Sequence, residues 1–134
     1  MHSASAAPNV ALVNEFKKGL FAAGYIEGKN VEIEYRWAEG RLSRLPQLAS
    51  ELVNRKIAVI ATPGSTPAAL AAKAATSTIP IVFAVGGDPV RLKLVDRSGK
   101  NITGIGFESV QIAGKSLGIL RELLPKASRV IAVL

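Results

Sequence analysis

Apolar residues recur along the chain with two different periods, and each period predicts a different kind of element. Spacings of three and four positions predict amphipathic helices, whereas alternation, or a short apolar run between turn residues, predicts a strand. Gly24 follows the first helical segment as a left-handed cap, and Ser43 is the expected cap of the second. Helices are expected over residues 9–23, about 44–54, from Ser65 or Thr66 onward, about 109–124, and over a short stretch at 89–96.

Five segments have the pattern of strands. Residues 31–37 (VEIEYRW) alternate apolar with charged side chains, which predicts a strand with one more polar face. The others are short and largely apolar, as in strands buried on both faces of a parallel sheet: residues 57–61, 79–85, 101–107 and 129–134. Because helices and strands alternate, the predicted fold class is α/β, a three-layer α/β/α sandwich with a mainly parallel, five-stranded, flavodoxin-like sheet.

Three loops follow the carboxyl ends of predicted strands, where open α/β sheets bind their ligands. They are Thr62–Thr66, Gly86–Pro89 and Gly106–Ser109. Because the carboxyl ends of parallel strands meet at one edge of the sheet, the sequence predicts a binding site at that edge. The architecture alone does not say what the site binds.

Composition narrows the possible classes of function. The 134 residues fit one domain, residues 1–134, and 49% hydrophobic with 20% charged residues indicates a packed core. The formal net charge is +7, but the basic residues are scattered and aromatic residues are few, which argues against a nucleic-acid partner. No stretch has the ~18 consecutive apolar residues of a membrane-spanning helix.

The inventory of reactive side chains argues against an enzyme and against a metalloprotein. The chain has no cysteine, and its single histidine, His2, is expected in a frayed terminus. Thiolate zinc sites, cysteine nucleophiles and Ser-His-Asp triads therefore lack the residues they need. We expect no catalytic residue, no bound metal and no cofactor. The start, MHSASAAPNV, has neither a basic nor an apolar region, so we expect no secretory signal in this chain.

Several motifs occur in an order that resembles a known family. GYIEGKNVEIEYRWAEG, TPAALAAKAATSTIPIVF, GGDPV and NITG are similar to motifs of bacterial ABC transporter solute-binding proteins, over about residues 10–134. The resemblance implies one lobe of a type I periplasmic binding protein, whose two lobes close on a small solute, often an aromatic amino acid. It also implies an ABC permease as partner and a periplasmic or membrane-anchored exterior location. A cytoplasmic location is expected if these residues are the full gene product.

The chain departs from this family at both ends. The family has a secretion signal and a strand ahead of the first helix, and a second lobe after the region that corresponds to residue 134. Residues 129–134 (RVIAVL) resemble the opening strand of that second lobe. Because a missing strand leaves an unpaired strand edge, we expect Val130–Leu134 to pair there. The pairing is expected either within the chain or in a neighbouring copy, as a homodimer by strand exchange.

The first loop of the predicted site has two interpretations. Gly64, Ser65 and Thr66, with the N–H groups of Ala68 and Ala69, can hold a ligand carboxylate, because a helix N-terminus offers unpaired donors and partial positive charge. Alternatively, Ser65 or Thr66 caps its own helix and has no further role. The sequence leaves these two interpretations open.

The other candidate residues come from the remaining loops and the N-terminus. Asp88 can accept a hydrogen bond from a ligand ammonium, with Gly87 allowing close backbone approach, or it can form an Asx turn with its own backbone. Phe107 can pack on an apolar ligand or in the core, and Glu108 follows it where the chain would cross between lobes. Ser5, in the segment SASA, can supply a hydroxyl to the same site.

The predicted function is therefore a non-enzymatic lobe that binds a small, amino-acid-like solute for an ABC transporter. The alternative is a stand-alone dimeric sensor or interaction domain that uses the same lobe. Because one lobe offers only half of the contacts around a solute, we expect weak or absent binding by this chain alone.

Overall fold

The computed structural model describes residues 1–95 and 100–107 of the chain. The expected helix over 109–124, the expected strand over 129–134 and Glu108 lie outside the described residues. The elements are, in order, the 3-10 helix η1 (Ala7–Asn9), α1 (Val10–Ala22), the 3-10 helix η2 (Leu42–Arg44), α2 (Leu45–Asn54), β1 (Ile60–Pro63), α3 (Thr66–Ala75), β2 (Ile81–Gly86) and β3 (Ile102–Phe107).

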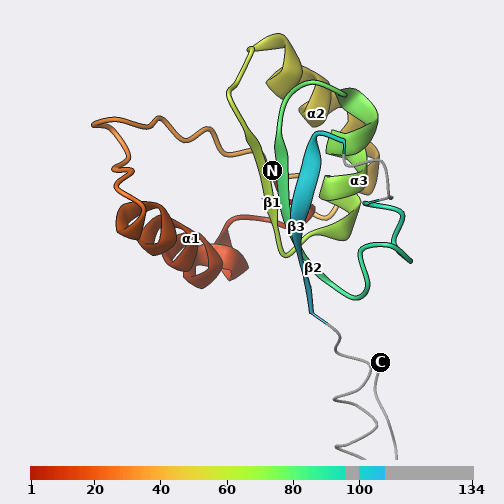
Figure 1. The fold of residues 1–134 in the computed structure, drawn as a ribbon, viewed down its shortest axis with the longest axis horizontal. Coiled ribbons are helices and arrows are strands. Elements are labelled where there is room, and N and C mark those ends of the chain that lie inside the picture. Colours follow the sequence, from red (N-terminus) through yellow and green to blue (C-terminus); the bar gives the residue numbers. More distant parts are fainter. Residues whose placement is uncertain (96–99, 108–134) are drawn as a thin grey trace, which may run out of the picture.

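The three strands form one parallel sheet in the order β1-β2-β3. α2 and α3 pack against each other on one side of the sheet, and α1 lies on the opposite side (Figure 1). The α/β class and the parallel sheet are therefore confirmed for the described residues. Of the five expected strands, the described part of the chain contains three.

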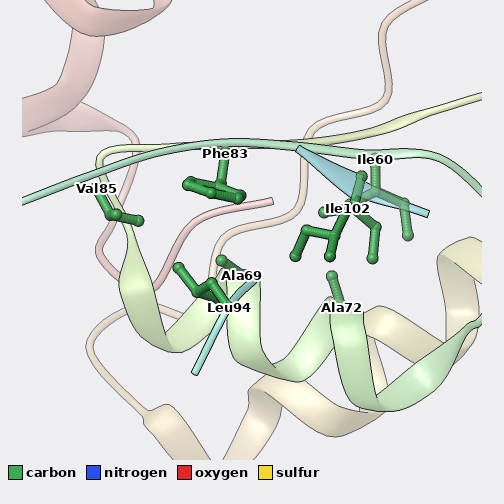
Figure 2. Close-up of a cluster of buried hydrophobic side chains, with 8 residues drawn as sticks. Ile60, Ala69, Ala72, Phe83, Val85, Leu94 and Ile102 are labelled. Atoms are coloured by element: carbon green, nitrogen blue, oxygen red, sulfur yellow. The ribbon is translucent and has the colours of Figure 1, made fainter. Parts of the chain in front are cut away.

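The core lies between the sheet and α3. Every second residue of β2 points into it, so Ile81, Phe83 and Val85 are buried, whereas Val82 and Gly86 on the other face are exposed. Figure 2 shows Ala69 and Ala72 of α3 facing these strands. Small side chains at this helix face allow the helix to approach the sheet closely. The cluster comprises Ile60, Ala69, Ala72, Ile81, Phe83, Val85, Leu94 and Ile102.

The face of the sheet on the α1 side is only partly covered by the described residues. Val82 of β2 is 46% exposed, and Ile105 and Phe107 of β3 are 57% and 58% exposed. α1 itself contains no buried residue. The third layer of the expected sandwich is therefore present only in part within residues 1–95 and 100–107.

The expected strand over residues 31–37 does not form as a sheet strand. The segment makes only isolated bridges, of Trp37 with His2 and of Val31 with Glu27. Alternation of side chains describes which way each side chain points, but a strand also needs a neighbour for its backbone hydrogen bonds. Beside this segment, the described residues supply such a neighbour only at His2 and Glu27.

Ion pairs hold the segment against α2 instead. Glu34 Oε1 lies 2.6 Å from Arg55 Nη2, and Glu34 Oε2 lies 2.9 Å from Arg36 Nη2. Arg36 Nε in turn lies 3.7 Å from Glu51 Oε2 of α2. The Arg55 hydrogen bond lowers the pKa of Glu34, which keeps this carboxylate ionised. The network explains how an extended segment keeps its position without a continuous ladder.

Two smaller expectations were also wrong. Ser43 does not cap α2, because the 3-10 helix η2 precedes it and Arg44 occupies the N-cap without a side-chain bond. Residues 89–93 form a hydrogen-bonded turn rather than a helix, with Leu94 N donating to Pro89 O at 2.9 Å. Gly24 does adopt the expected left-handed conformation after α1, with φ of 86°.

The N-terminus is fixed rather than frayed, and it lies beside β1 (Figure 1). The Met1 amine donates to Ala61 O at 2.8 Å, and His2 N donates to Arg36 O at 2.9 Å. His2 is 8% exposed, which corrects the expectation of a disordered terminus. None of the helices in the described ranges combines the length and apolar composition that crossing a membrane requires.

Candidate functional site

The structure brings the three expected loops to one edge of the sheet. β1, β2 and β3 run parallel, so their carboxyl ends at Pro63, Gly86 and Phe107 face the same way. Gly64 N donates to Ala84 O at 2.8 Å, and Gly87 N donates to Phe107 O at 2.7 Å. These bonds join each loop to the neighbouring strand. We call this edge the rim: residues 62–66, 86–89 and Phe107.

Ser65 is the N-cap of α3. Its Oγ accepts from Ala68 N at 3.3 Å and from Ser3 N at 3.2 Å, and it donates to Ser3 Oγ at 2.9 Å. A hydroxyl offers one donor and two acceptor positions, so these three bonds use it completely. Ser65 is also only 2% exposed. Its capping role is thus confirmed, and in this conformation it holds the N-terminal segment rather than a ligand.

The cap also changes which donors of α3 remain for a ligand. Ala68 N bonds to Ser65 Oγ, and Ala69 N bonds to Ser65 O at 3.0 Å. Both N–H groups expected to hold a carboxylate are therefore already used within the helix. In the part of the chain that the structure describes, Thr66 remains as the first-turn residue with an N–H and a hydroxyl for an anion.

Gly64 is a rim residue that packs close to His2 and to Leu12 of α1. Its φ of 72° favours glycine, and a Cβ there would lie 3.3 Å from Leu12 Cδ2 and 3.5 Å from His2 Nε2. His2 Nδ1 accepts from Ala4 N at 3.0 Å, so this nitrogen carries no proton. Burial lowers the pKa of His2, with the nearby N-terminal charge as a further cause. The imidazole is therefore neutral and structural in this position.

Asp88 forms the Asx turn that was one of its two interpretations. Its Oδ1 accepts from Val90 N at 2.8 Å, and its Oδ2 lies 3.7 Å from Arg91 Nε. The Asp88 side chain remains 35% exposed, so one oxygen is still open to solvent. Gly87, next to it, has φ of 119°, and its carbonyl lies 2.3 Å from the position of a Cβ added to Gly106. The loop therefore packs directly on β3.

The remaining candidates contribute differently to the rim. Phe107 ends β3 and is 58% exposed, so it is a free apolar surface there rather than a core aromatic. Ser5 is partly buried, and its carbonyl accepts from Asn9 Nδ2 at 2.8 Å, which ties the segment to α1. Whether any of these residues touches a ligand stays a prediction. Among the described residues, no three acidic or histidine side chains gather as a metal site would need.

Sequence reasoning missed the importance of Ser3 and His2. Ser3 shares two hydrogen bonds with Ser65, and the His2 ring lies 5.5 Å from the Trp37 ring. The signal available was the hydroxyl-rich segment SASA, which contains Ser3, but Ser5 was the residue singled out. Both missed residues position the rim; neither adds an exposed ligand group to it.

Taken together, the rim offers one donor pair, one carboxylate and one apolar ring. The donor pair is Thr66 at the positive end of α3, the carboxylate is Asp88, and the ring is Phe107. This combination can bind a small molecule that has an anionic group, a cationic group and an apolar part.

Comparisons with known proteins agree with this fold. A family described as ABC transporter substrate binding protein matches residues 6–134. A curated tyrosine-binding protein of Clostridioides difficile (strain R20291) is 34% identical over 119 residues, which cover 86% of this chain and 33% of that protein. The chain thus spans about a third of the length of this relative.

Solved structures of similar proteins have the same fold. A conserved domain protein from Vibrio cholerae O1 biovar eltor str. N16961 has a TM-score of 0.79 at 36% identity, covering 93% of this chain and 42% of that one. A ligand-free, open substrate-binding protein with adhesive properties from Clostridium difficile has a TM-score of 0.75 at 31% identity, covering 94% and 43%. An ABC domain in complex with L-Trp from Streptococcus pneumonia shares the fold. Its TM-score is 0.75 at 24% identity, and the match covers 92% of this chain and 41% of that one.

Proposed function

Because the chain belongs to the ABC transporter substrate-binding protein family, a non-catalytic family, we propose that it forms one lobe of a receptor for an amino acid. The tyrosine-binding relative supports an aromatic amino acid as the solute. The complete lobe that we propose is the three-layer one with a five-stranded sheet. In an intact receptor of this kind, a second lobe closes on the solute and an ABC permease receives it, outside the cytoplasmic membrane.

The observation that carries the proposal is the set of groups at the rim. An amino acid has a carboxylate, an ammonium and a side chain, and the rim offers a partner for each. We assign the carboxylate to Thr66 at the N-terminus of α3, the ammonium to Asp88 and the aromatic ring to Phe107. We assign no ligand contact to Ser65, because its hydroxyl already bonds to Ser3 and to Ala68 N; it holds the first turn of α3 in place.

The proposal predicts weak, rim-specific binding by this chain alone. A ¹⁵N-labelled sample titrated with L-tyrosine should show amide shift changes in residues 64–66 and 86–88, with little change elsewhere. D-tyrosine and L-alanine are the controls and should shift these amides much less. Because half of the closing contacts are absent, the affinity should be too weak for calorimetry; micromolar binding would contradict the one-lobe assignment.

A pair of matched variants sharpens this test. Thr66→Val removes a hydroxyl at the assigned anion position, and Thr103→Val makes the same change on β3, away from the loops. Thr66→Val should reduce the shift changes caused by L-tyrosine, whereas Thr103→Val should leave them as they are. Equal effects of the two variants, or shifts that avoid the rim, would remove the basis for the proposed site.

A further inference from the structure

A groove runs between residues 31–37 and the outer edge of β1. It has a cavity volume of about 310 Å³, and its two walls are residues 57–61 and, on the other side, residues 31–32 and 34–37. Leu12, Val13 and Phe16 of α1 also line it. Met1 lies at one end of the groove, the end nearest the rim. Most of the lining is apolar, and Val59 on the β1 wall is 48% exposed.

The first residues of the chain show how a strand fits between these walls. Met1 N donates to Ala61 O on one side, while His2 pairs in parallel with Trp37 on the other. Residues 1–3 therefore lie where the last residues of a central strand would lie. Continued backward from Met1 in the same register, this strand position passes five residues of each wall, residues 57–61 and 31–35.

The edge of β1 that faces the groove lacks a continuous partner in the described residues. β1 pairs with β2 on its other side, and Ile60 N and Gly64 N both bond in that direction. Because backbone groups of alternate residues point to opposite edges of a parallel strand, those of Val59 and Ala61 point into the groove. An open apolar strand edge of this kind takes up an extended segment by backbone pairing.

We propose that residues 130–134 of this chain fill the groove as a strand parallel to β1. The segment VIAVL is wholly apolar and is about as long as the wall formed by residues 57–61. The segment runs in the same direction as β1, with Val130 toward Ile57 and Leu134 toward Met1, so that the Leu134 carboxylate ends short of the Met1 amine. Arg129 then enters at the end of the groove that Glu32 lines, so the charges there have opposite sign.

The uncovered face of the sheet supports the same assignment. A parallel connection from β3 back to the groove needs a crossover of about a dozen residues or more, and residues 108–129 are long enough. Such crossovers are right-handed. The crossover from β1 to β2 places α3 on one face of the sheet, so a crossover in the opposite direction, from β3 back to the groove, passes over the other face. That is the face where Val82 and Ile105 are exposed.

The occupant of the groove can be identified by cross-linking from Met1. Met1 is the only methionine and it lines the groove, so biosynthetic replacement by photo-methionine places one diazirine there without any mutation. After irradiation and trypsin digestion, we expect Met1 cross-linked to the peptide of residues 130–134. In a mixture of ¹⁵N-labelled and unlabelled protein, the cross-linked peptides should carry one isotope only. Cross-links to other segments, or cross-links that join labelled with unlabelled copies, would overturn the proposal.

A second measurement uses Trp37, the only tryptophan, which also lines the groove. Ile131→Asp should expel the segment and so increase quenching of Trp37 fluorescence by acrylamide. Leu42→Asp places the same charge at a residue that is 55% exposed and outside the groove, and it should leave the quenching unchanged. Added VIAVL peptide should restore protection in Ile131→Asp. A folded Ile131→Asp protein with unchanged quenching contradicts the proposal; if this variant does not fold, the photo-cross-link decides.

Discussion

At the scale of single residues, one hydroxyl joins three parts of the molecule. Ser65 Oγ caps α3 through Ala68 N and binds Ser3 through both its N–H and its hydroxyl. The sequence offered this cap, at Ser65 or Thr66, as one of two open interpretations of the loop. It did not predict the bonds to Ser3, because contacts 62 residues apart leave no local pattern.

Replacing this serine should cost stability. Ser65→Ala should lower the free energy of unfolding by about 1–2 kcal/mol, since the cap is lost and buried donors lose their acceptor. Ser43→Ala is the matched control, because Ser43 does not cap α2, and its effect should stay within about 0.5 kcal/mol. Urea denaturation of both variants gives the comparison. Equal losses in the two variants would show that the Ser65 bonds are not energetically distinct.

At the scale of elements, the sequence predicted those whose signals are local. The helices at 9–23, 44–54 and after Ser65 agree with α1, α2 and α3 to within a few residues, and three of the apolar runs overlap β1, β2 and β3, with ends that differ by up to three residues. The segment 31–37 was wrong as a strand, because its alternation reports side-chain direction and not the presence of a neighbour. The sequence predicted which loops form the rim, because the carboxyl ends of parallel strands lie at one edge of the sheet. It did not predict that the Ser65 hydroxyl is used up, because that depends on how residues 1–3 pack against the rim.

Packing between elements predicts opposite effects of one substitution at two glycines. In β3, a Cβ on Gly106 would lie 2.3 Å from Gly87 O and 2.6 Å from Pro89 Cδ, so Gly106→Ala should destabilise by about 1–3 kcal/mol. In α1, Gly19 has nothing within 4 Å of the added atom. Gly19→Ala should therefore stabilise the protein by about 0.5–1 kcal/mol. Thermal unfolding measures both, and a stable Gly106→Ala protein would contradict the close contact of rim and β3.

At the scale of the whole molecule, the described residues make a sheet with one complete and one partial face. α2 and α3 cover one face, and α1 with the fixed N-terminus occupies part of the other (Figure 1). The sequence predicted the three layers from alternation, but it has no means of showing where backbone pairing stops. The groove beside β1 is such a place, and only the hydrogen bonds of residues 1–3 reveal its register.

The free energy of unfolding should rise with pH between about 6 and 8. Burial, with the charge of Arg36, lowers the pKa of the Met1 amine from 8.0 to about 6, and burial also lowers the pKa of His2. In this range the unfolded chain binds more protons than the folded one, so each group adds a positive slope of at most about 1.4 kcal/mol per pH unit.

Urea titrations at several pH values test this dependence, and acetylation of the Met1 amine is the control. An acetylated chain keeps an N–H for Ala61 but loses the titrating charge, so its slope should be smaller. At lower pH the sign stays the same, because the lowered pKa of Glu34 means that its stabilising charge is lost as pH falls through that pKa. A stability that falls between pH 6 and 8 would contradict the burial of Met1.

The bond between Met1 and Ala61 also bears on the order of folding. It closes a loop of 60 residues, whereas α3 joins β1 to β2 through neighbours in the chain. Loop closure costs more entropy as the loop lengthens, and contacts between distant residues form slowly. The α/β core should therefore assemble first, and the amino end should dock onto a surface that already exists. In native-state hydrogen exchange, the amides of residues 2 and 38 should open well before those of β2.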